Sequence, residues 1–394
     1  MVFCRSQHLY AALAAAIFSV IWVHGAAAQY RLDPAFAHEH MLGPAAAKGA
    51  VVYSHGRSVN SEDSLSPTPP YMETLQDAGW DTYRFDRMRD SDTLPDSTRE
   101  LVVIVGQLKQ RGYRHVVLTG QSFGAFLSLM AADASDEVYA VVATAPAAYG
   151  SFSDYYQSWE NNATQLYPLL ERVRRARVML FYFHGDDFDP GGRGPRSEAI
   201  LTAHDIDHIV IDQPPQLTTH WAATTGLFVR RFGDCIRSFI EAETADRVSC
   251  SSSWGTSPSQ QIAFPAHFHT VSTGDAGDGA GAFAGKWYGF YGNGREVMFA
   301  VEKVTGDRVT AIYSIGPGIR PGEKSEWVRR TGRVVGNELV FEGKGLNTLR
   351  YKLRPDGKLQ AWWVAEDGKS SLETTLRRTD SPQISPTVTA AGSQ

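Results

Sequence analysis

The feature that most constrains this chain of 394 residues is the pentapeptide GQSFG at residues 120–124, which has Ser122 at its centre. It lies between a largely apolar run at 115–119, which predicts a buried strand, and a run at 123–132, which predicts a helix. The chain must turn sharply here, and the two glycines let strand and helix approach closely because they lack a Cβ. The turn is therefore expected to expose the Ser122 hydroxyl beside the N–H groups of a helix N-terminus.

Strand-like and helix-like segments alternate over residues 47–241, and this alternation predicts βαβ units and a mainly parallel, doubly wound α/β sheet. Apolar runs such as AVVY and VMLFYF are typical of strands that are covered by helices on both faces. The predicted strands are 50–54, 81–85, 115–119, 139–144, 178–183 and 208–211, and the predicted helices include 71–78, 97–111, 123–132, 165–175 and 196–204. Chemistry is expected at the carboxyl ends of such strands.

The GQSFG pentapeptide in this setting resembles the nucleophile elbow of the α/β-hydrolase family. The compact size of the region and the near absence of predicted strands before residue 50 resemble the dienelactone-hydrolase or cutinase-like members of that family. The resemblance implies that Ser122 is a nucleophile. It also implies that the N–H of Phe123 helps to hold an oxyanion. The remaining elbow residues are Gly120, Gln121 and Gly124.

The apolar strand at 50–54 runs into His55 and a glycine, which resembles the family's oxyanion loop. This implies a second N–H donor from Arg57 or Ser58. His55 is then expected to organise the loop, at the edge of the substrate cleft, and not to act as a base.

The resemblance places an acid in the turn after the strand at 178–183, where the run HGDDFDP occupies residues 184–190. Asp189 fits because a proline follows it, Asp187 fits if the loop is one residue shorter, and Asp186 remains a third candidate. A calcium loop is the alternative for this acidic turn, but the glycine and glutamate of an EF-hand are missing.

The base is expected after the next strand, and His220 stands in that loop, just before a helical stretch that begins near residue 221. His204 and His208 lie before or inside the strand and are expected to be ordinary packed or solvated side chains. The chain order of serine, aspartate and histidine is that of the family, in which the histidine accepts the serine proton and the aspartate orients the imidazole.

Three aromatic side chains between the strands at 139–144 and 178–183 are candidates for a substrate cleft. They are Tyr155, Tyr156 and Trp159. Packing at a half-buried surface would explain them equally well.

A second domain is predicted at 281–379, after a linker at 250–280 that is rich in Ser, Gly and Asp. About eight short strands separated by turns such as NG and DG favour a small antiparallel barrel or a highly curved sheet. Its opening GKWYG at 285–289 resembles the first strand of lipocalin- or avidin-like barrels. The domain's aromatic residues either fill the barrel or bind a sugar or apolar ligand; they are Trp287, Tyr288, Tyr291, Trp327, Trp362 and Trp363. Residues 380–394 are expected to form a flexible tail.

The N-terminus indicates export. Arg5, an apolar stretch over 10–23 and three alanines before Gln29 form the pattern of a signal peptide at 1–28, with an uncleaved membrane anchor as the alternative. The first domain then covers 29–249. Cys235 and Cys250 remain as a pair, which predicts a disulfide in an oxidising compartment, the periplasm or outside the cell.

The charge and composition argue against nucleic acid and membrane surfaces as binding partners. The net charge of −5 without a long basic run gives no indication of nucleic-acid binding or of an anionic membrane surface. No residue cluster calls for a metal or an organic cofactor. The predicted function is hydrolysis of a small-molecule or polymeric ester by a secreted serine hydrolase. A peptidase or amidase on the same fold, or a non-catalytic protein that binds ligand through its second domain, are the alternatives.

Overall fold

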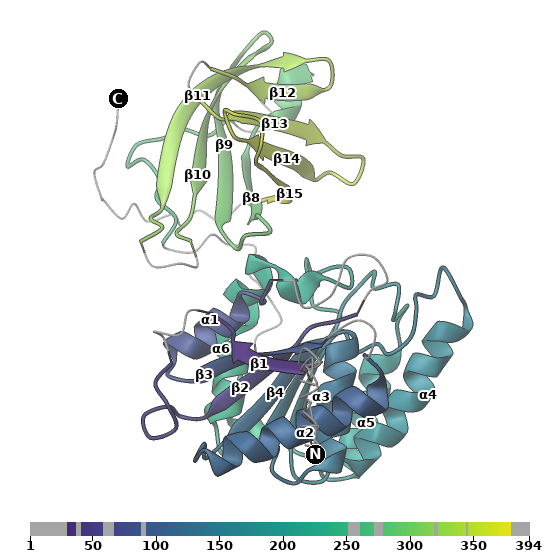
Figure 1. Ribbon diagram of the computed structural model, residues 1–394. Coiled ribbons are helices and arrows are strands. Elements are labelled where there is room, and N and C mark those ends of the chain that lie inside the picture. Colours follow the sequence, from purple (N-terminus) through teal and green to yellow (C-terminus); the bar gives the residue numbers. More distant parts are fainter. Residues whose placement is uncertain are drawn as a thin grey trace, which may run out of the picture.

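The computed structural model contains a unit with a helix-covered sheet and a β-barrel, drawn one above the other in Figure 1. The predicted signal peptide, Ser58 and the predicted tail lie outside the described residues. The structure describes residues 30–36, 41–57, 67–87, 92–250, 261–271, 279–318, 322–343 and 346–379.

The first unit is built on a seven-stranded sheet with the order β1-β3-β2-β4-β5-β6-β7. Its strands are β1 (Tyr30–Pro34), β2 (Ala50–Ser54), β3 (Asp81–Arg87), β4 (Val116–Gln121), β5 (Ala140–Thr144), β6 (Arg177–Tyr182) and β7 (His208–Asp212). Strands β2 to β7 pair in parallel, and β1 runs antiparallel to β3 at one edge. The predicted mainly parallel α/β architecture is confirmed, and the GQSFG turn joins β4 to the following helix, as predicted.

Helices cover both faces of this sheet, which explains why its strands read as continuous apolar runs (Figure 1). One face packs against α2 (Leu94–Gln110), α3 (Phe123–Ala134), α4 (Gln157–Arg172) and α5 (Arg193–Ala203). The other face packs against α1 (Tyr71–Asp77) and α6 (Gly226–Glu241). Alternate residues of one strand serve the two cores: Leu118 faces the first group of helices, and Val117 faces the second.

Two features of this unit differ from the sequence expectations. Strand β1 was not predicted, because its alternating half-buried and exposed residues over only five positions give a weak signal. Helix α4 begins at Gln157, eight residues before its predicted start at 165, since its first turns are mainly polar.

The second unit is a closed barrel of eight antiparallel strands, which confirms the barrel alternative. The strands are β8 (Lys286–Phe290), β9 (Glu296–Thr305), β10 (Arg308–Ile315), β11 (Glu326–Val335), β12 (Glu338–Phe341), β13 (Thr348–Leu353), β14 (Leu359–Val364) and β15 (Ser371–Arg378). Each strand pairs with its sequence neighbour, and β15 closes the barrel on β8. Buried side chains fill its core, among them Trp287, Tyr291 and Tyr351.

The predicted disulfide is confirmed: Cys235 in α6 is bonded to Cys250, with their Cα atoms 5.3 Å apart. Helix α6 also contacts the barrel, because the N–H of Leu227 donates to the carbonyl of Gly292 over 3.1 Å. Phe290 of β8 packs against the core under α6. Within the described part of the chain, no helix combines the length and apolarity that a bilayer crossing requires.

Candidate active site

Ser122 lies on the turn between β4 and α3 in a strained backbone conformation. Its φ is 56° and its ψ is −120°, a region that costs a residue with a side chain about 1–3 kcal/mol. The turn depends on its glycines, since a Cβ on Gly124 would lie 2.0 Å from the carbonyl oxygen of Ser54. A Cβ on Gly120 would lie 2.3 Å from the carbonyl carbon of Gly124. The sequence GQSFG therefore forms the tight turn that its spacing predicts.

His220 is buried in the loop after β7, and its imidazole faces a buried carboxylate. The Nδ1 atom lies 2.9 Å from Oδ1 of Asp186. The side chain of His220 is 5% exposed and that of Asp186 is fully buried. Because an ionised carboxylate only accepts hydrogen bonds, Nδ1 donates and Nε2 is left as an acceptor. Among the described residues, Nε2 has no hydrogen-bond partner.

The carboxylate beside His220 is therefore not the one that the sequence favoured. Asp189 instead lies 3.2 Å from Nε of Arg193 in a buried ion pair, and its Oδ1 accepts from the N–H of Gly191. Asp187 accepts hydrogen bonds from the backbone and hydroxyl of Ser153. The prediction that Asp189 or Asp187 contacts His220 is therefore wrong, and Asp186, the third candidate, makes this contact.

The turn after β6 explains this outcome. A β-bridge joins Asp186 to Asp189, and the N–H of Asp189 donates to the carbonyl of Asp186 over 3.0 Å. The loop thus closes on itself, which brings its first aspartate to the sheet edge. Gly185 provides the positive φ of 69° at the start of the turn.

The loops that carry the aspartate and the histidine are fastened to each other and to the elbow. The N–H of Thr219 donates to the carbonyl of His184 over 2.9 Å. The buried side chain of Gln121 donates from Nε2 to the carbonyl of His220 over 3.1 Å. Phe188 stacks on the imidazole at 4.1 Å between ring centroids. These contacts hold the imidazole at the carboxyl ends of the parallel strands, where Ser122 also lies.

The loop after β2 lies against the elbow, where an oxyanion site was predicted. Phe123 is the first residue of α3, so its N–H has no partner within the helix. The guanidinium carbon of Arg57 lies 5.6 Å from the centroid of the Phe123 ring. The alternative donor Ser58 lies outside the described residues.

His55 is an uncharged organiser of this loop. Its Nδ1 lies 2.7 Å from the carbonyl oxygen of Gly56, and its Nε2 accepts from the N–H of Arg87 over 3.2 Å. Burial, together with the positive charge of Arg87, lowers the pKa of His55 from 6.5 to about 2. A ring held in this way supports the loop and does not exchange protons near neutral pH.

Sequence reasoning missed the buried ion pair that holds the same loop. Arg87 donates to the carbonyl of His55 over 2.5 Å, and its Nε donates to Asp92 over 2.9 Å. Both side chains are almost fully buried. The one available signal was a charged residue at the carboxyl end of β3, which does not separate Arg87 from the arginines near it in sequence.

The three aromatic candidates lie at the start of α4 or just before it. Tyr155 and Tyr156 are 58% and 59% exposed, and Trp159 is half-buried. The N–H of Phe152 donates to the carbonyl of Asp187, which ties this segment to the loop of Asp186. Among the described residues, no group of three or more His, Cys, Asp or Glu side chains could hold a metal ion.

Comparisons with known proteins give similarities of structure alone. No protein-family model and no curated protein matches the chain. An esterase of Pyrococcus furiosus is similar at 13% identity and a TM-score of 0.39, over 50% of this chain and 81% of that chain. An acylaminoacyl peptidase of Pyrococcus horikoshii is similar at 13% identity and a TM-score of 0.39, over 55% of this chain and 39% of that chain.

A puromycin-hydrolysing peptidase of Mycobacterium tuberculosis is similar at 15% identity and a TM-score of 0.37, over 55% of this chain and 38% of that chain. The matched region thus spans less than half of each peptidase. At these identities and TM-scores, the likeness does not bear on activity or substrate.

Proposed function

We propose that this chain is a serine hydrolase that cleaves carboxylic esters through an acyl-enzyme on Ser122. The observation that carries the proposal is the buried contact between His220 and Asp186, at the sheet edge where the strained turn holds Ser122. An imidazole oriented by a carboxylate, with Nε2 available, is the general base that a serine nucleophile needs.

In the proposed first half-reaction, the Ser122 oxygen attacks the ester carbonyl carbon while its proton passes to Nε2 of His220. The negative charge that develops on the carbonyl oxygen is stabilised by the N–H groups of Phe123 and Arg57, with the positive end of the α3 dipole behind them. The C–O bond to the alcohol then breaks, and the leaving oxygen takes the proton from His220.

In the second half-reaction, water replaces the alcohol. It loses a proton to Nε2 of His220 as its oxygen attacks the acyl carbon, and the tetrahedral intermediate expels the Ser122 oxygen, which recovers the proton. Asp186 stabilises the imidazolium in both halves through its contact with Nδ1. The products are a carboxylic acid and an alcohol.

We also propose that the chain is exported to the periplasm or beyond the cell. The disulfide between Cys235 and Cys250 supports this, because such bonds persist mainly in oxidising compartments. Fractionation of cells that express the full chain tests it: recovery of the protein in the cytoplasm, with both thiols reduced, would contradict export.

The hydrolase proposal is tested with p-nitrophenyl esters of increasing acyl length and with a fluorophosphonate probe. Ester cleavage and covalent labelling are expected for the purified full chain, and both are expected to be lost in Ser122→Ala. Ser135→Ala, at the other end of α3, is the matched control and is expected to keep both. An intact protein that neither cleaves esters nor is labelled would overturn the proposal, as would cleavage of anilides without cleavage of esters.

A further inference from the structure

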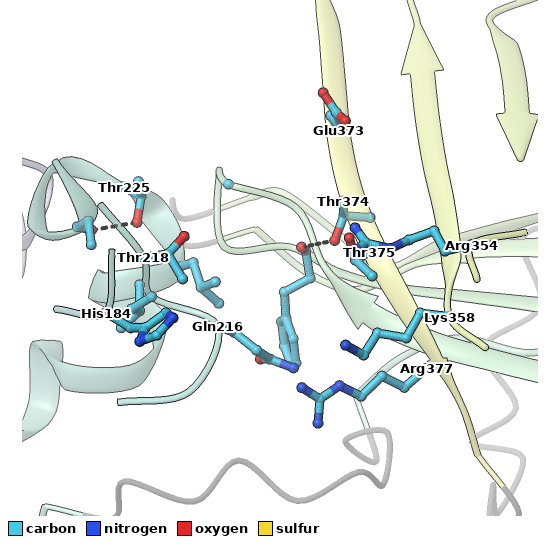
Figure 2. Close-up of a pocket in the computed structure, with 15 residues that line it drawn as sticks. His184, Gln216, Thr218, Thr225, Arg354, Lys358, Glu373, Thr374, Thr375 and Arg377 are labelled. Atoms are coloured by element: carbon cyan, nitrogen blue, oxygen red, sulfur yellow. Dashed lines mark hydrogen bonds between the residues drawn. The ribbon is translucent and has the colours of Figure 1, made fainter. Parts of the chain in front are cut away.

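A cavity of about 740 Å³ lies between the sheet unit and the barrel, apart from the residues assigned to ester cleavage. The sheet unit contributes the loop before His220 and the start of α6, and the barrel contributes β15 and the turn before β14. In Figure 2, Lys358 and Arg377 extend from the barrel toward Gln216, and His184 lies on the opposite wall.

The charge in this cavity is unusual for a chain with a net charge of −5. The lining carries three cations, Arg354, Lys358 and Arg377, and one carboxylate, Glu373. Glu373 forms no ion pair with them among the described residues, and its Oε1 accepts from the amide of Gln360.

The neighbouring contacts leave one of these cations without a counter-ion. Arg354 and Lys358 share Asp356, at 3.2 and 2.9 Å. Arg377 makes no ion pair with any residue in the part of the chain that the structure describes, and it is exposed to the cavity.

The cations do not serve to join the two units. The opposite wall is lined by His184 and by amide, hydroxyl and apolar side chains, and it includes no carboxylate. The units meet instead through backbone contacts near Leu227 and through Arg230, whose Nε donates to the carbonyl of Gly294. Arg377, which has no counter-ion among the described residues, therefore faces a wall without carboxylates and is available to a ligand, with Lys358 beside it.

We propose that this cavity binds a small hydroxylated organic anion, such as a sugar acid or a sugar phosphate. Arg377 and Lys358 would hold its carboxylate or phosphate, since charge-assisted hydrogen bonds to such groups are the strong ones. Gln216, Thr218 and Thr375 offer partners for its hydroxyl groups, and Phe290 offers an apolar wall for its ring. The ligand would also contact the loop of His220, because Thr218 lies only two residues before it.

The test is isothermal titration calorimetry on the Ser122→Ala form, so that its outcome does not depend on whether the chain hydrolyses esters. The probes are glucuronate for a carboxylate, glucose 6-phosphate for a phosphate, and glucose as the neutral control. At least one acid is expected to bind at millimolar or lower concentration, and more weakly as salt rises, because ions screen partly exposed charges. The preferred acid tells the carboxylate ligand from the phosphate ligand.

Arg377→Gln is expected to weaken binding by about tenfold, the usual effect of losing one charge-assisted hydrogen bond. Lys358→Gln gives an independent second variant if the first does not fold. Arg333→Gln, on the exposed side of β11, is the matched control and is expected to bind normally. Absence of binding by both acids up to about 10 mM, a weak limit even for small ligands, would overturn the proposal. Equal binding of glucose, or equal loss in the Arg333 variant, would overturn it too.

Discussion

The side-chain amide of Gln121 donates to the backbone carbonyl of His220 over 3.1 Å, and both residues are buried. These residues are 99 positions apart in the chain. The contact connects the residue before Ser122 to the loop that carries the imidazole. This hydrogen bond therefore positions the backbone of His220 relative to the elbow.

Gln121→Met keeps the size of this side chain and removes the donor, so it should lower kcat. Loss of a buried hydrogen bond costs about 1–2 kcal/mol, and roughly a tenfold fall in kcat follows if the loop moves away from the elbow. Steady-state kinetics with a p-nitrophenyl ester measures this. Gln110→Met, on the exposed end of α2, is the control, and an unchanged kcat in Gln121→Met would show that the contact does not position His220.

Asp186→Asn should leave the fold intact and nearly abolish turnover. The amide presents either an oxygen or an NH₂ group to Nδ1, so the imidazole tautomer is no longer fixed, and a loss of kcat of about 10⁴ is expected if the proposed triad operates. Asp187→Asn is the matched control, because the Asp187 carboxylate contacts Ser153 and not the imidazole. If Asp187→Asn lost as much activity as Asp186→Asn, the proposed role of Asp186 would be wrong.

The sequence was sufficient for the parts of the fold that depend on local pattern. The apolar runs of β2, β4 and β6 and the glycines of the elbow specify a buried parallel sheet with Ser122 at its edge. Which of the three nearby aspartates contacts His220 could not be predicted from local pattern. It depends on the turn that closes between Asp186 and Asp189 and on Arg193. The Arg193 side chain forms an ion pair with Asp189, the aspartate that the following proline had favoured as the triad acid.

Contacts between segments that are distant in the chain could not be predicted from the sequence either. The support of the loop after β2 comes from Arg87 and Asp92, whose pairing is settled by packing and leaves no periodic signal. The cavity between the two units arises only from how the barrel meets α6. Its cations lie on β15 and on the turn before β14, where they resemble ordinary exposed residues of a barrel.

The buried pair of Asp189 and Arg193 gives a prediction about stability. Asp189→Asn leaves the Arg193 guanidinium buried without its counter-charge, which should lower the free energy of unfolding by about 3–5 kcal/mol. Its kcat, measured well below the melting temperature, should stay close to that of the wild type. Urea unfolding gives the first quantity and ester kinetics the second.

The double variant Asp189→Leu/Arg193→Met supplies the control for this pair. Replacing both charges with apolar side chains removes the unpaired guanidinium, so much of the stability should return. A single variant as stable as the wild type would show that the ion pair contributes nothing, and a large loss of kcat would assign Asp189 to the chemistry after all.

His55 gives a prediction about acid stability. Its pKa is about 2 in the folded protein against 6.5 for an unperturbed histidine, so below pH 6.5 the unfolded chain binds a proton that the native state does not. The stability linked to neutral His55 is therefore complete above pH 6.5 and is lost as the pH falls toward 2. The slope approaches about 1.4 kcal/mol per pH unit once the unfolded histidine is protonated.

His55→Gln removes this titration, so its stability should fall less steeply than that of the wild type between pH 6 and pH 4, with the two slopes differing by about 1.4 kcal/mol per unit. Urea unfolding at pH intervals of about half a unit resolves such a difference. His204→Gln, at an exposed position after α5, should keep the wild-type slope. Parallel curves for the wild type and His55→Gln would mean that His55 takes up its proton in the native state, and the loop after β2 would then need another account of how it is held.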